Sequence, residues 1–432
     1  MIVILALGTK GDLIPALAIA QRLTARNQRV RIVTHAHLLV SEWVPSGIEC
    51  CGVDDEDPHL LDRALVAAVC AQTTFVLASL FCIGPACAAA EARRVPFAAF
   101  ATFAASDFPH PPEFIRALTD SLPVDLRFPL ELRHPLRHWL WRLFINDVGD
   151  LREACGLDPM PLALLNGEAP LLFYAIPRPL FALVVDPQML HDSIRVCGQW
   201  ILNRSLDNPS FMASHPSVST FLAERNSRKL IHIGFGSMDC FHPILSQQAE
   251  AVRAIIRAIY FGLESANMCA LWVVNAREGD ACELMEQLTK SAAVQTRICV
   301  IRGPVDYAAL FASGIVCGSV NHGGIGTILE VLRGGLKQVV APFMFDQERW
   351  GSRLELEGVA KCFCDIDPEF ITADEWKMAF EWLGNPQGME KVLRWQGILE
   401  RSDADDGISV ACDAIVEKTR DQLKCNNNDK IK

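Results

Sequence analysis

A glycine-rich turn in the second half of the chain contains the residues best suited to bind a phosphate group. The segment VNHGGIGTILE, residues 320–330, follows an apolar run at 315–318 that indicates a strand, and its last residues indicate a helix. Glycines let a backbone approach a ligand closely, and free N–H groups at the start of a helix attract phosphate. His322 and Thr327 add side-chain donors at the same turn. The turn therefore predicts a phosphate contact, with a structural histidine in a tight turn as the alternative.

Two polar residues follow the next predicted strand, residues 338–341. Asp346 and Gln347 provide a carboxylate and an amide, which are suitable hydrogen-bonding partners for sugar hydroxyls. A solvated helix cap is the alternative interpretation of this pair. The pair therefore favours a sugar contact after this strand.

The first turn of the chain places an acidic residue where a helix begins. The sequence Gly8-Thr9-Lys10-Gly11-Asp12 separates an apolar strand, 2–7, from an apolar helix pattern. A plain N-cap explains Asp12 structurally, because aspartate is a favoured cap and the helix dipole stabilises its charge. The functional alternative is that a turn at the carboxyl edge of a parallel sheet faces the crevice where such sheets bind ligands.

Predicted strands and helices alternate along the chain, which indicates parallel sheets with crossover helices. The strands expected in the first half are 2–7, 30–34, 75–80 and 97–102. Those expected in the second half are 229–235, 270–274, 297–301, 315–318, 338–341 and 360–364. A polar stretch, 203–228, separates the two series and predicts a linker. The expected fold class is α/β, with two doubly wound domains that face each other.

The composition excludes several classes of protein. The chain has 432 residues, of which 50% are hydrophobic and 21% charged, so it is neither a small disulfide scaffold nor a disordered chain. Its mean hydropathy is +0.20. With 40 basic and 51 acidic residues, the formal net charge is −11, and no basic run occurs. This balance excludes the electrostatic pattern of nucleic-acid binding, so no nucleic-acid partner is expected.

Sixteen cysteines and one long uncharged segment need separate explanations. The cysteines lack zinc-site spacing, so we expect reduced thiols that pack as small hydrophobic residues. Residues 64–90 contain no charge over a length that can span a bilayer. Polar residues at 72–74 and Gly84-Pro85 interrupt the segment, which favours helix, strand and helix over a transmembrane helix. The N-terminus lacks a signal-peptide pattern, so a cytoplasmic location is expected, and peripheral membrane contact stays open.

The block from residue 302 to residue 347 resembles the donor-binding signature of nucleotide-sugar-dependent glycosyltransferases, which include plant UDP-glycosyltransferases and sterol glucosyltransferases. NHGGIGTILE, the LRGG turn, VVAPF and the closing Asp-Gln occur in the family's order. The opening GTKGD followed by IPALAIAQRL resembles the sterol-glucosyltransferase N-terminus, and VCGQW at 196–200 resembles its inter-domain element. The resemblance implies a GT-B fold, in which two facing Rossmann-like doubly wound domains have a cleft between them.

The resemblance also implies a division of labour along the chain. Residues 1–202 would be the acceptor-binding domain and residues 203–228 the inter-domain linker. Residues 229–394 would be the nucleotide-sugar-binding domain. Residues 395–432 would form a C-terminal helix that returns to the first domain, followed by a frayed tail.

Position in the family motifs assigns the donor-binding residues. The residues implied at the diphosphate are Ser237, His322, Gly324, Gly326 and Thr327. Those implied at the ribose and sugar hydroxyls are Glu330, Asp346 and Gln347. Arg302 and Val305 are implied at the nucleobase end of the block. Arg302 stands where plant members have a tryptophan that stacks on uracil, and a guanidinium can also stack on a base.

The mechanism implied by the resemblance is a single displacement with inversion. Asp12 is the expected general base, since the resembling bacterial and sterol enzymes place an acid in this turn, while Asp107 and His110 lie in a loop that can approach it. UDP-glucose is the expected donor, as a co-substrate, and no cofactor is expected. The expected acceptor is a lipophilic alcohol of secondary metabolism, such as a terpenoid, sterol or polyketide. No metal is expected, because His322 and a helix N-terminus can stabilise the departing charge.

Two other functions stay open at this point. A nucleotide-sugar 2-epimerase shares the GT-B architecture but would need further charged residues around the sugar. A catalytically silent nucleotide-sugar-binding partner protein would keep the diphosphate motif and lose the base. The chain is expected to be a monomer.

Overall fold

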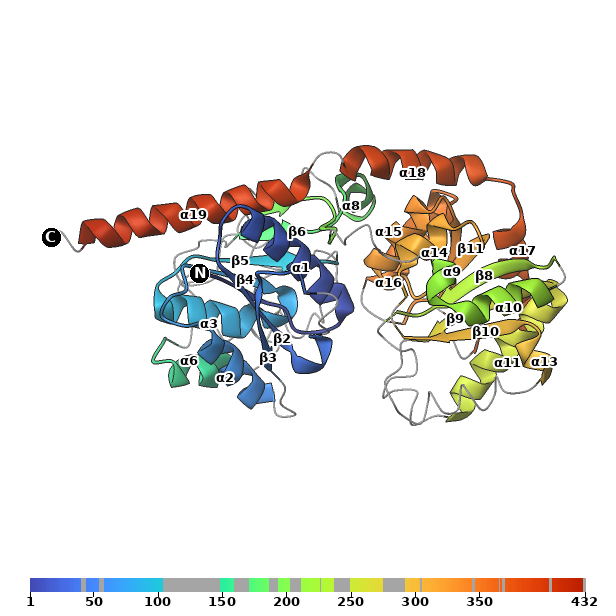
Figure 1. Ribbon diagram of the computed structural model, residues 1–432, viewed down its shortest axis with the longest axis horizontal. Helices are drawn as coiled ribbons and strands as arrows, with labels where there is room; N and C mark the ends of the chain where they lie inside the picture. Colours follow the sequence, from blue (N-terminus) through green and yellow to red (C-terminus); the bar gives the residue numbers. More distant parts are fainter. Residues whose placement is uncertain are drawn as a thin grey trace, which may run out of the picture. The chain divides into compact units, whose positions relative to one another are not determined.

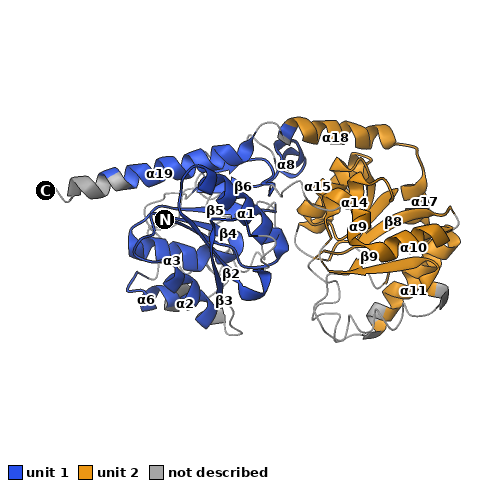
Figure 2. Cartoon of the chain, in the orientation of Figure 1, with its two compact units in different colours: residues 1–203, 402–432 blue, residues 204–401 orange. Residues whose placement is uncertain are grey.

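The structure is a computed structural model that forms two compact units, each built on one parallel sheet (Figures 1 and 2). It describes residues 1–39, 44–53, 58–103, 148–158, 171–185, 193–202, 211–225, 227–236, 249–274, 292–303, 305–343, 346–364, 366, 370–403 and 406–429. Residues 1–203 and 402–432 make up the first unit, and residues 204–401 make up the second.

The first unit contains a seven-stranded sheet with the order β3-β2-β1-β4-β5-β6-β7, and its described pairs are all parallel. The strands are β1 (Ile2–Leu5), β2 (Val30–His35), β3 (Glu49–Val53), β4 (Phe75–Ser79), β5 (Phe97–Ala101), β6 (Leu171–Tyr174) and β7 (Ile194–Val196). The strand order reverses between β1 and β4. Doubly wound sheets bind ligands outside the carboxyl ends of the strands at such a reversal, so the turns after β1 and β4 are the natural place for a site.

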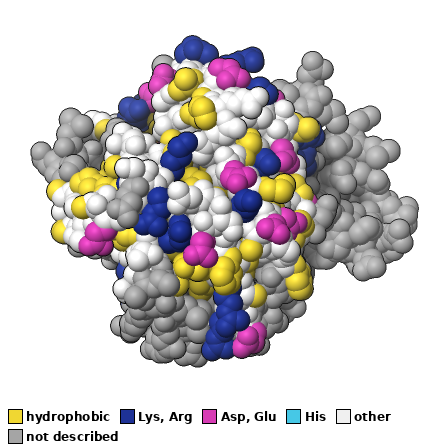
Figure 3. Space-filling model, turned by 90° about the vertical axis from the view of Figure 1, so that its right-hand side faces the viewer, with side chains coloured by type: hydrophobic (Ala, Val, Ile, Leu, Met, Phe, Trp, Pro, Cys, Tyr) yellow, Lys and Arg dark blue, Asp and Glu magenta, His cyan; other side chains and the backbone are white. Residues whose placement is uncertain are grey.

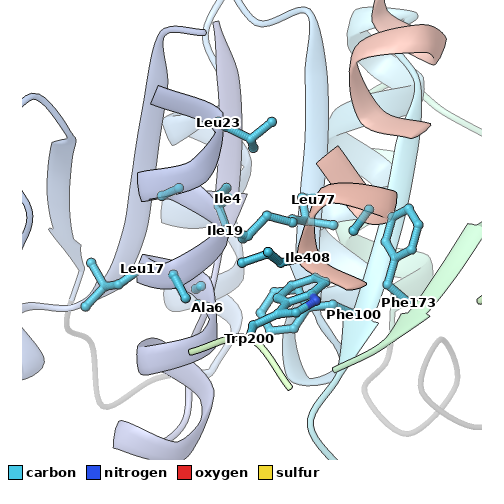
Figure 4. Packing of buried hydrophobic residues seen from close by; sticks show 14 of the residues in the cluster. Ile4, Ala6, Leu17, Ile19, Leu23, Leu77, Phe100, Phe173, Trp200 and Ile408 are labelled. Carbon is cyan, nitrogen blue, oxygen red and sulfur yellow. The ribbon is translucent and has the colours of Figure 1, made fainter. Parts of the chain in front are cut away.

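Helices cover both faces of this sheet, which explains why its central strands β1, β4 and β5 are buried almost throughout. They are α1 (Lys10–Ala25), η1 (Ala36–Leu38), α2 (Pro58–Ala68), η2 (Leu80–Cys82), α3 (Ile83–Arg93), α6 (Val148–Ala154), α8 (Arg178–Val184) and α19 (Gly407–Asp429). Along β1, Ile2 and Ile4 pack into one core, and Val3 and Leu5 pack into the core on the opposite face. Figure 4 shows the first core, where the Trp200 ring lies 5.3 Å from that of Phe100.

The C-terminal helix α19 belongs to the first unit and lies beside α1 (Figure 1). Ile408 and other apolar residues of α19 join the core of α1 and β1 (Figure 4). Arg22 of α1 and Arg26, which caps the end of α1, form ion pairs with Asp406 and Asp413, at 2.8 and 2.6 Å. These ion pairs are exposed, so the apolar burial supplies most of the attachment.

The second unit contains a six-stranded sheet with the order β10-β9-β8-β11-β12-β13, and its described pairs are also parallel. The strands are β8 (Lys229–Gly234), β9 (Met268–Val274), β10 (Ile298–Arg302), β11 (Gly318–Asn321), β12 (Lys337–Val340) and β13 (Ala360–Cys362). The described helices are α9 (Phe211–Ser214), α10 (Pro216–Glu224), α11 (Ala249–Ser265), α13 (Ala292–Gln295), α14 (Tyr307–Ala312), α15 (Ile325–Arg333), α16 (Gln347–Leu356), α17 (Ala373–Gly384) and α18 (Met389–Asp403). Here the strand order reverses between β8 and β11, which directs attention to the turns after these two strands.

One predicted strand is displaced along the chain. The apolar run 315–318 indicated a strand, yet β11 occupies Gly318–Asn321 and pairs Ser319 with His232 of β8. The prediction was wrong because polar residues form the buried ladder here. The Ser319 hydroxyl lies 2.9 Å from Nδ1 of His232, and this hydrogen bond compensates for their burial.

Other elements were not predicted at all. The strands β3 and β7 carry partly exposed residues, so they lack the continuous apolar pattern of a central strand. The strand β6 is apolar but only four residues long. The helices α9 and α10 form within the range predicted as a linker, where Phe211, Val218 and Phe221 are buried in a core of the second unit.

The long uncharged segment 64–90 folds as predicted. It contains the end of α2, the strand β4 and most of α3. Within the described part of the chain, no helix is both long and apolar enough to cross a membrane. The cysteines of the described residues are free thiols.

One face of the molecule can be examined for charge in Figure 3. Lys and Arg side chains lie interspersed with Asp and Glu side chains, and apolar side chains lie between them. Among the described residues on this face, charges of one sign do not gather into a large patch. This face therefore offers no strongly charged surface that would attract a charged ligand.

Candidate functional site

In the first unit, the turn after β1 holds Asp12 in a helix-capping arrangement. Thr9 is the N-cap of α1, and Asp12 is the third residue of the helix. The Thr9 backbone N–H donates to Asp12 Oδ2 at 2.9 Å, and the Thr9 hydroxyl lies 3.3 Å from the same oxygen. The Thr9 hydroxyl in turn accepts from the Gly11 N–H at 3.1 Å. The plain N-cap interpretation of Asp12 is therefore wrong in detail, because Thr9 is the cap and Asp12 completes a capping box.

The Asp12 carboxylate lies directly over Gly8, in a confined space. A methyl group added at Gly8 would lie 2.5 Å from Oδ2, and Gly8 has a φ of +119°, which favours glycine. The side chain of Phe81, in the turn after β4, comes within 3.5 Å of the same point. The Phe81 ring also lies 5.7 Å from that of Phe103, which follows β5. Asp12 is only 6% exposed, so an acid and two aromatic rings lie together at the strand ends.

The buried thiol of Cys82 packs against the same turn. Cys82 Sγ accepts a hydrogen bond from the Leu7 N–H at 3.2 Å and lies 3.6 Å from the Ser79 hydroxyl. Burial raises the pKa of Cys82 to about 12, and the nearby Asp12 charge adds to the rise. Cys82 is therefore a neutral thiol at neutral pH, and it ties the end of β1 to the end of β4 rather than acting as a nucleophile.

In the second unit, the glycine-rich turn lies between β11 and α15, and His322 is packed between two glycines. A methyl group at Gly236, after β8, would lie 2.5 Å from His322 Cε1, and one at Gly324 would lie 2.3 Å from Nε2. Gly236 and Gly323 have φ values of +78° and +88°. The absence of side chains at Gly236 and Gly324 is thus what leaves room for the imidazole.

The His322 imidazole is buried and neutral. Burial lowers its pKa to about 4. Within the described residues, its Nδ1 has no hydrogen-bond partner. A neutral imidazole carries one N–H donor, so His322 can donate to a ligand that enters this turn.

The helix that follows offers its backbone N–H groups to the same place. Gly324 is the N-cap of α15, and no side chain caps this end of the helix. A methyl group added at Gly326 meets nothing within 4 Å, so the first turn of the helix is open. Thr327 is 9% exposed and stands in this turn. An uncapped helix N-terminus next to a histidine is suited to bind an anion.

Asp346 and Gln347 begin α16, immediately beside the glycine-rich turn. Gln347 is 4% exposed, and its Oε1 accepts from the Phe343 N–H at 2.8 Å. A methyl group at Gly323 would lie 2.9 Å from the Gln347 carbonyl oxygen, so the two turns are in contact. Asp346 Oδ2 accepts from the Trp350 indole N–H at 2.6 Å and makes no cap hydrogen bond to the helix. The solvated-cap interpretation therefore does not describe this pair.

The remaining predicted donor residues lie farther along the sheet or outside the described residues. Glu330 lies on α15 and forms an ion pair with Arg333 at 3.5 Å. Arg302 is exposed at the end of β10, two strands away from β8. Val305 packs against the core beneath α14. Ser237, Asp107 and His110 lie outside the residues that the structure describes.

Sequence reasoning missed the polar residues that hold the glycine-rich turn in place. Asn321 is fully buried, and its Oδ1 accepts from the Gly323 N–H at 2.8 Å. Its side-chain amide donates to Gln338 Oε1 at 3.0 Å. An asparagine side chain often accepts from the backbone N–H two residues later, so the sequence could have predicted the role of Asn321 in this turn. The role of Gly236 could not be predicted in this way, because its contact with His322 joins residues far apart in the sequence.

The described residues contain no evident metal site. No group of three or more His, Cys, Asp or Glu side chains there is arranged to hold an ion. The charge of a bound anion would instead meet the N–H groups of α15 and His322.

A family model identifies part of the chain. Residues 2–106 match the glycosyltransferase family 28 N-terminal domain. Sterol 3-beta-glucosyltransferases are similar over nearly the whole chain. The protein of Aspergillus fumigatus is 24% identical, over 95% of this chain and 29% of its own length. That of Komagataella phaffii is 26% identical, over 96% of this chain and 34% of its own length. The chain thus spans about a third of these curated relatives.

Solved structures have the same fold. A UDP-glucose:anthocyanidin 3-O-glucosyltransferase in complex with UDP matches with a TM-score of 0.64 and 16% identity, over 96% of this chain and 98% of its own. The glycosyltransferase VinC in complex with dTDP matches with a TM-score of 0.64 and 15% identity, over 97% of this chain and 99% of its own. The fold class is confirmed as α/β, with two Rossmann-like sheets and GT-B glycosyltransferases as structural neighbours. Together the matches confirm the resemblance.

Proposed function

We propose that the chain moves a hexosyl group from a nucleotide sugar to a hydroxyl of a lipophilic small molecule, and that UDP-glucose is the donor. The observation that carries this proposal is the uncapped N-terminus of α15 beside the buried His322. The N-terminal residues of the same chain match a glycosyltransferase domain. The proposal extends the relatives' activity to a chain about a third of their length.

The donor's diphosphate binds at the glycine-rich turn in this proposal. The N–H groups of Gly324, Gly326 and Thr327, together with the His322 N–H, donate to its oxygens. These donors are fixed before the ligand arrives, so they stabilise the charge that grows on the diphosphate as the sugar departs. A neutral imidazole and a helix N-terminus do this without a metal ion.

The rest of the donor binds on either side of the turn. Asp346 and Gln347 bind hydroxyls of the hexose, and their position is supported by the contact between Gln347 and Gly323. Glu330 binds the ribose hydroxyls, for which it must exchange its ion pair with Arg333. Arg302 stacks on the nucleobase, beside Val305, while Ser237 contributes near the diphosphate.

Asp12 is the general base of the proposed reaction. The acceptor hydroxyl gives its proton to the Asp12 carboxylate as its oxygen attacks the anomeric carbon. The bond to the diphosphate breaks on the opposite face, which inverts the configuration, and the nucleoside diphosphate leaves with the bonding electron pair. The two hydrogen-bonding groups of Thr9 orient the carboxylate of the base.

The acceptor is a lipophilic alcohol in this proposal, of the terpenoid, sterol or polyketide type. Phe81 and Phe103 support it, since they place apolar rings next to the Asp12 turn. The sterol 3-beta-glucosyltransferases among the relatives point the same way. A sugar polymer would need polar groups in place of these rings.

Product analysis by mass spectrometry tests the proposal. The purified chain is incubated with UDP-glucose and a panel of lipophilic alcohols, with and without a chelator, and the Asp12→Asn variant is the control. We expect a product heavier by one hexose, formed at the same rate with chelator and greatly reduced in the variant. An altered sugar nucleotide without glycoside would support the epimerase instead. UDP binding without any product would support the silent partner protein.

A further inference from the structure

Two cysteines, Cys362 and Cys364, lie against the first turns of α16. Cys362 ends β13 and Cys364 follows two residues later. Cys364 Sγ lies 3.0 Å from the Ser352 hydroxyl oxygen, and Cys362 Sγ lies 3.9 Å from the Glu348 carbonyl oxygen. The Ser352 hydroxyl donates to that same carbonyl at 2.9 Å. Two thiols and a hydroxyl therefore gather at one carbonyl of α16, and we call this group the dithiol cluster.

The two thiols of the dithiol cluster contact different atoms of α16, which gives them different surroundings. Burial raises the pKa of the Cys362 thiol, and its hydrogen bond with Cys364 raises it further. Cys362 therefore stays protonated at neutral pH. Both residues are partly exposed, so small reagents can reach them. Cys364 is consequently the thiol placed to react first, with Cys362 beside it to react second.

The dithiol cluster is linked to the glycine-rich turn by direct contacts. A methyl group added at Gly351 would lie 2.3 Å from Cys362 Sγ and 3.0 Å from Val340 Cγ1. Val340 Cγ1 would in turn lie 2.8 Å from a methyl group at Gly323. Phe363, between the two cysteines, donates its backbone N–H to the Val340 carbonyl at 2.9 Å. Val340 thus touches both the chain between the cysteines and the turn that holds His322.

We propose that Cys362 and Cys364 are a modification site, at which exchange with a low-molecular-weight disulfide such as oxidised glutathione forms an intrachain disulfide that weakens ligand binding at the glycine-rich turn. In the first step, the Cys364 thiolate attacks one glutathione sulfur, the S–S bond breaks and one glutathione thiolate leaves. In the second step, Cys362 loses its proton to water and attacks Cys364 Sγ in the mixed disulfide. The second glutathione thiolate leaves, so two protein thiols are oxidised and one glutathione disulfide is reduced.

The disulfide changes the backbone because the two cysteines are close to the limit of its reach. Residues i and i+2 of an extended strand have Cα atoms about 6.6 Å apart. A disulfide usually joins Cα atoms about 4.4–6.8 Å apart, most often about 5.5–6 Å. The chain must therefore contract at Phe363, which pulls on its hydrogen bond to Val340. The expected loss of donor affinity rests on the proposed function, whereas formation of the disulfide does not.

Peptide mass tests the modification. Trypsin cleaves after Lys361 and Lys377, and the peptide between them contains these two cysteines and no others. After the full-length reduced chain is treated with oxidised glutathione, we expect this peptide to be two hydrogens lighter. In the Cys362→Ser variant, we expect a glutathione adduct on Cys364 instead. Unmodified peptide from the treated wild-type chain, or a stable glutathione adduct on its Cys364, would overturn the proposal.

Titration calorimetry with UDP tests the coupling. The oxidised chain should bind UDP about fivefold more weakly than the reduced chain, and reduction with dithiothreitol should restore the affinity. Cys317→Ser, in the same unit and away from the dithiol cluster, is the control and should show the same response as wild type. Equal affinities of the oxidised and reduced wild-type chains would overturn the coupling. No UDP binding by the reduced chain would overturn the donor site itself, while the peptide mass still decides the disulfide.

Discussion

The turns at Gly8–Asp12 and Asn321–Thr327 each follow a strand at the reversal of strand order in their sheet, β1 in the first unit and β11 in the second. Their polar groups are used differently. In the first turn, Asp12 and Thr9 satisfy each other within a capping box. In the second turn, no side chain caps the helix, and Nδ1 of His322 has no partner among the described residues. The first turn thus fixes the Asp12 carboxylate through the cap of its own helix, α1. The second turn leaves donors for a ligand, which explains why it has the more recognisable sequence.

The largest expected effect concerns the first turn. Asp12→Asn keeps a side-chain oxygen that can accept from the Thr9 N–H, so the capping box and the fold should persist. The variant loses the basic carboxylate, and kcat should fall about 100-fold. Steady-state kinetics with UDP-glucose and a lipophilic alcohol measure it, and an unchanged melting temperature serves as the control. Turnover close to that of the wild type would remove Asp12 from the mechanism.

The next effect concerns the second turn. In Gly324→Ala, the new methyl group would lie 2.3 Å from His322 Nε2, so the imidazole must move out of its position between Gly236 and Gly324. UDP affinity should fall about tenfold, a loss of about 1.4 kcal/mol. Gly397→Ala is the matched control, because this glycine lies within α18, where alanine is favourable. Equal UDP affinities of both variants and the wild type, measured by calorimetry, would show that the turn does not depend on His322.

Acid stability distinguishes the two turns by a different property. Burial lowers the pKa of His322 to about 4, whereas an unfolded histidine titrates near about 6.5. Between these values the unfolded chain binds more protons, so stability is lost as the pH falls from about 6.5 toward 4. His322→Gln should flatten this part of the stability curve measured by urea unfolding. His232, whose pKa burial lowers to about 3, remains in the variant and accounts for a residual slope. An unchanged curve would place His322 in a solvated environment.

The smallest expected effect tests the capping box alone. Thr9→Ala removes the hydroxyl that accepts from the Gly11 N–H and contacts Asp12. The first unit should lose about 1 kcal/mol of stability. Its melting temperature should then fall by about 2–4 °C in calorimetry. Thr24→Ala, near the end of the same helix, is the comparison for a hydroxyl without a hydrogen-bond partner among the described residues. A larger fall for Thr24→Ala would contradict the capping role.

The sequence predicted the parallel sheets and the two turns because both depend on local patterns. Strands buried on both faces are continuously apolar, and a glycine-rich strand–helix turn has a distinct composition. The exact place of β11 was not predictable, since His232, Ser319 and Asn321 are polar yet buried, and only their partners in other strands make that possible. The packing of His322 against Gly236 depends in the same way on the pairing of β8 with β11. Contacts between distant residues therefore decided what local patterns left open.

Calorimetric comparison of UDP with uridine shows whether the glycine-rich turn binds a diphosphate. The two ligands share the base and ribose and differ only in the diphosphate. Because the donors at this turn are the α15 N–H groups and His322, UDP should bind at least about 100-fold more tightly than uridine, a difference of about 2.7 kcal/mol. Equal affinities for UDP and uridine, or no binding of either, would contradict the account.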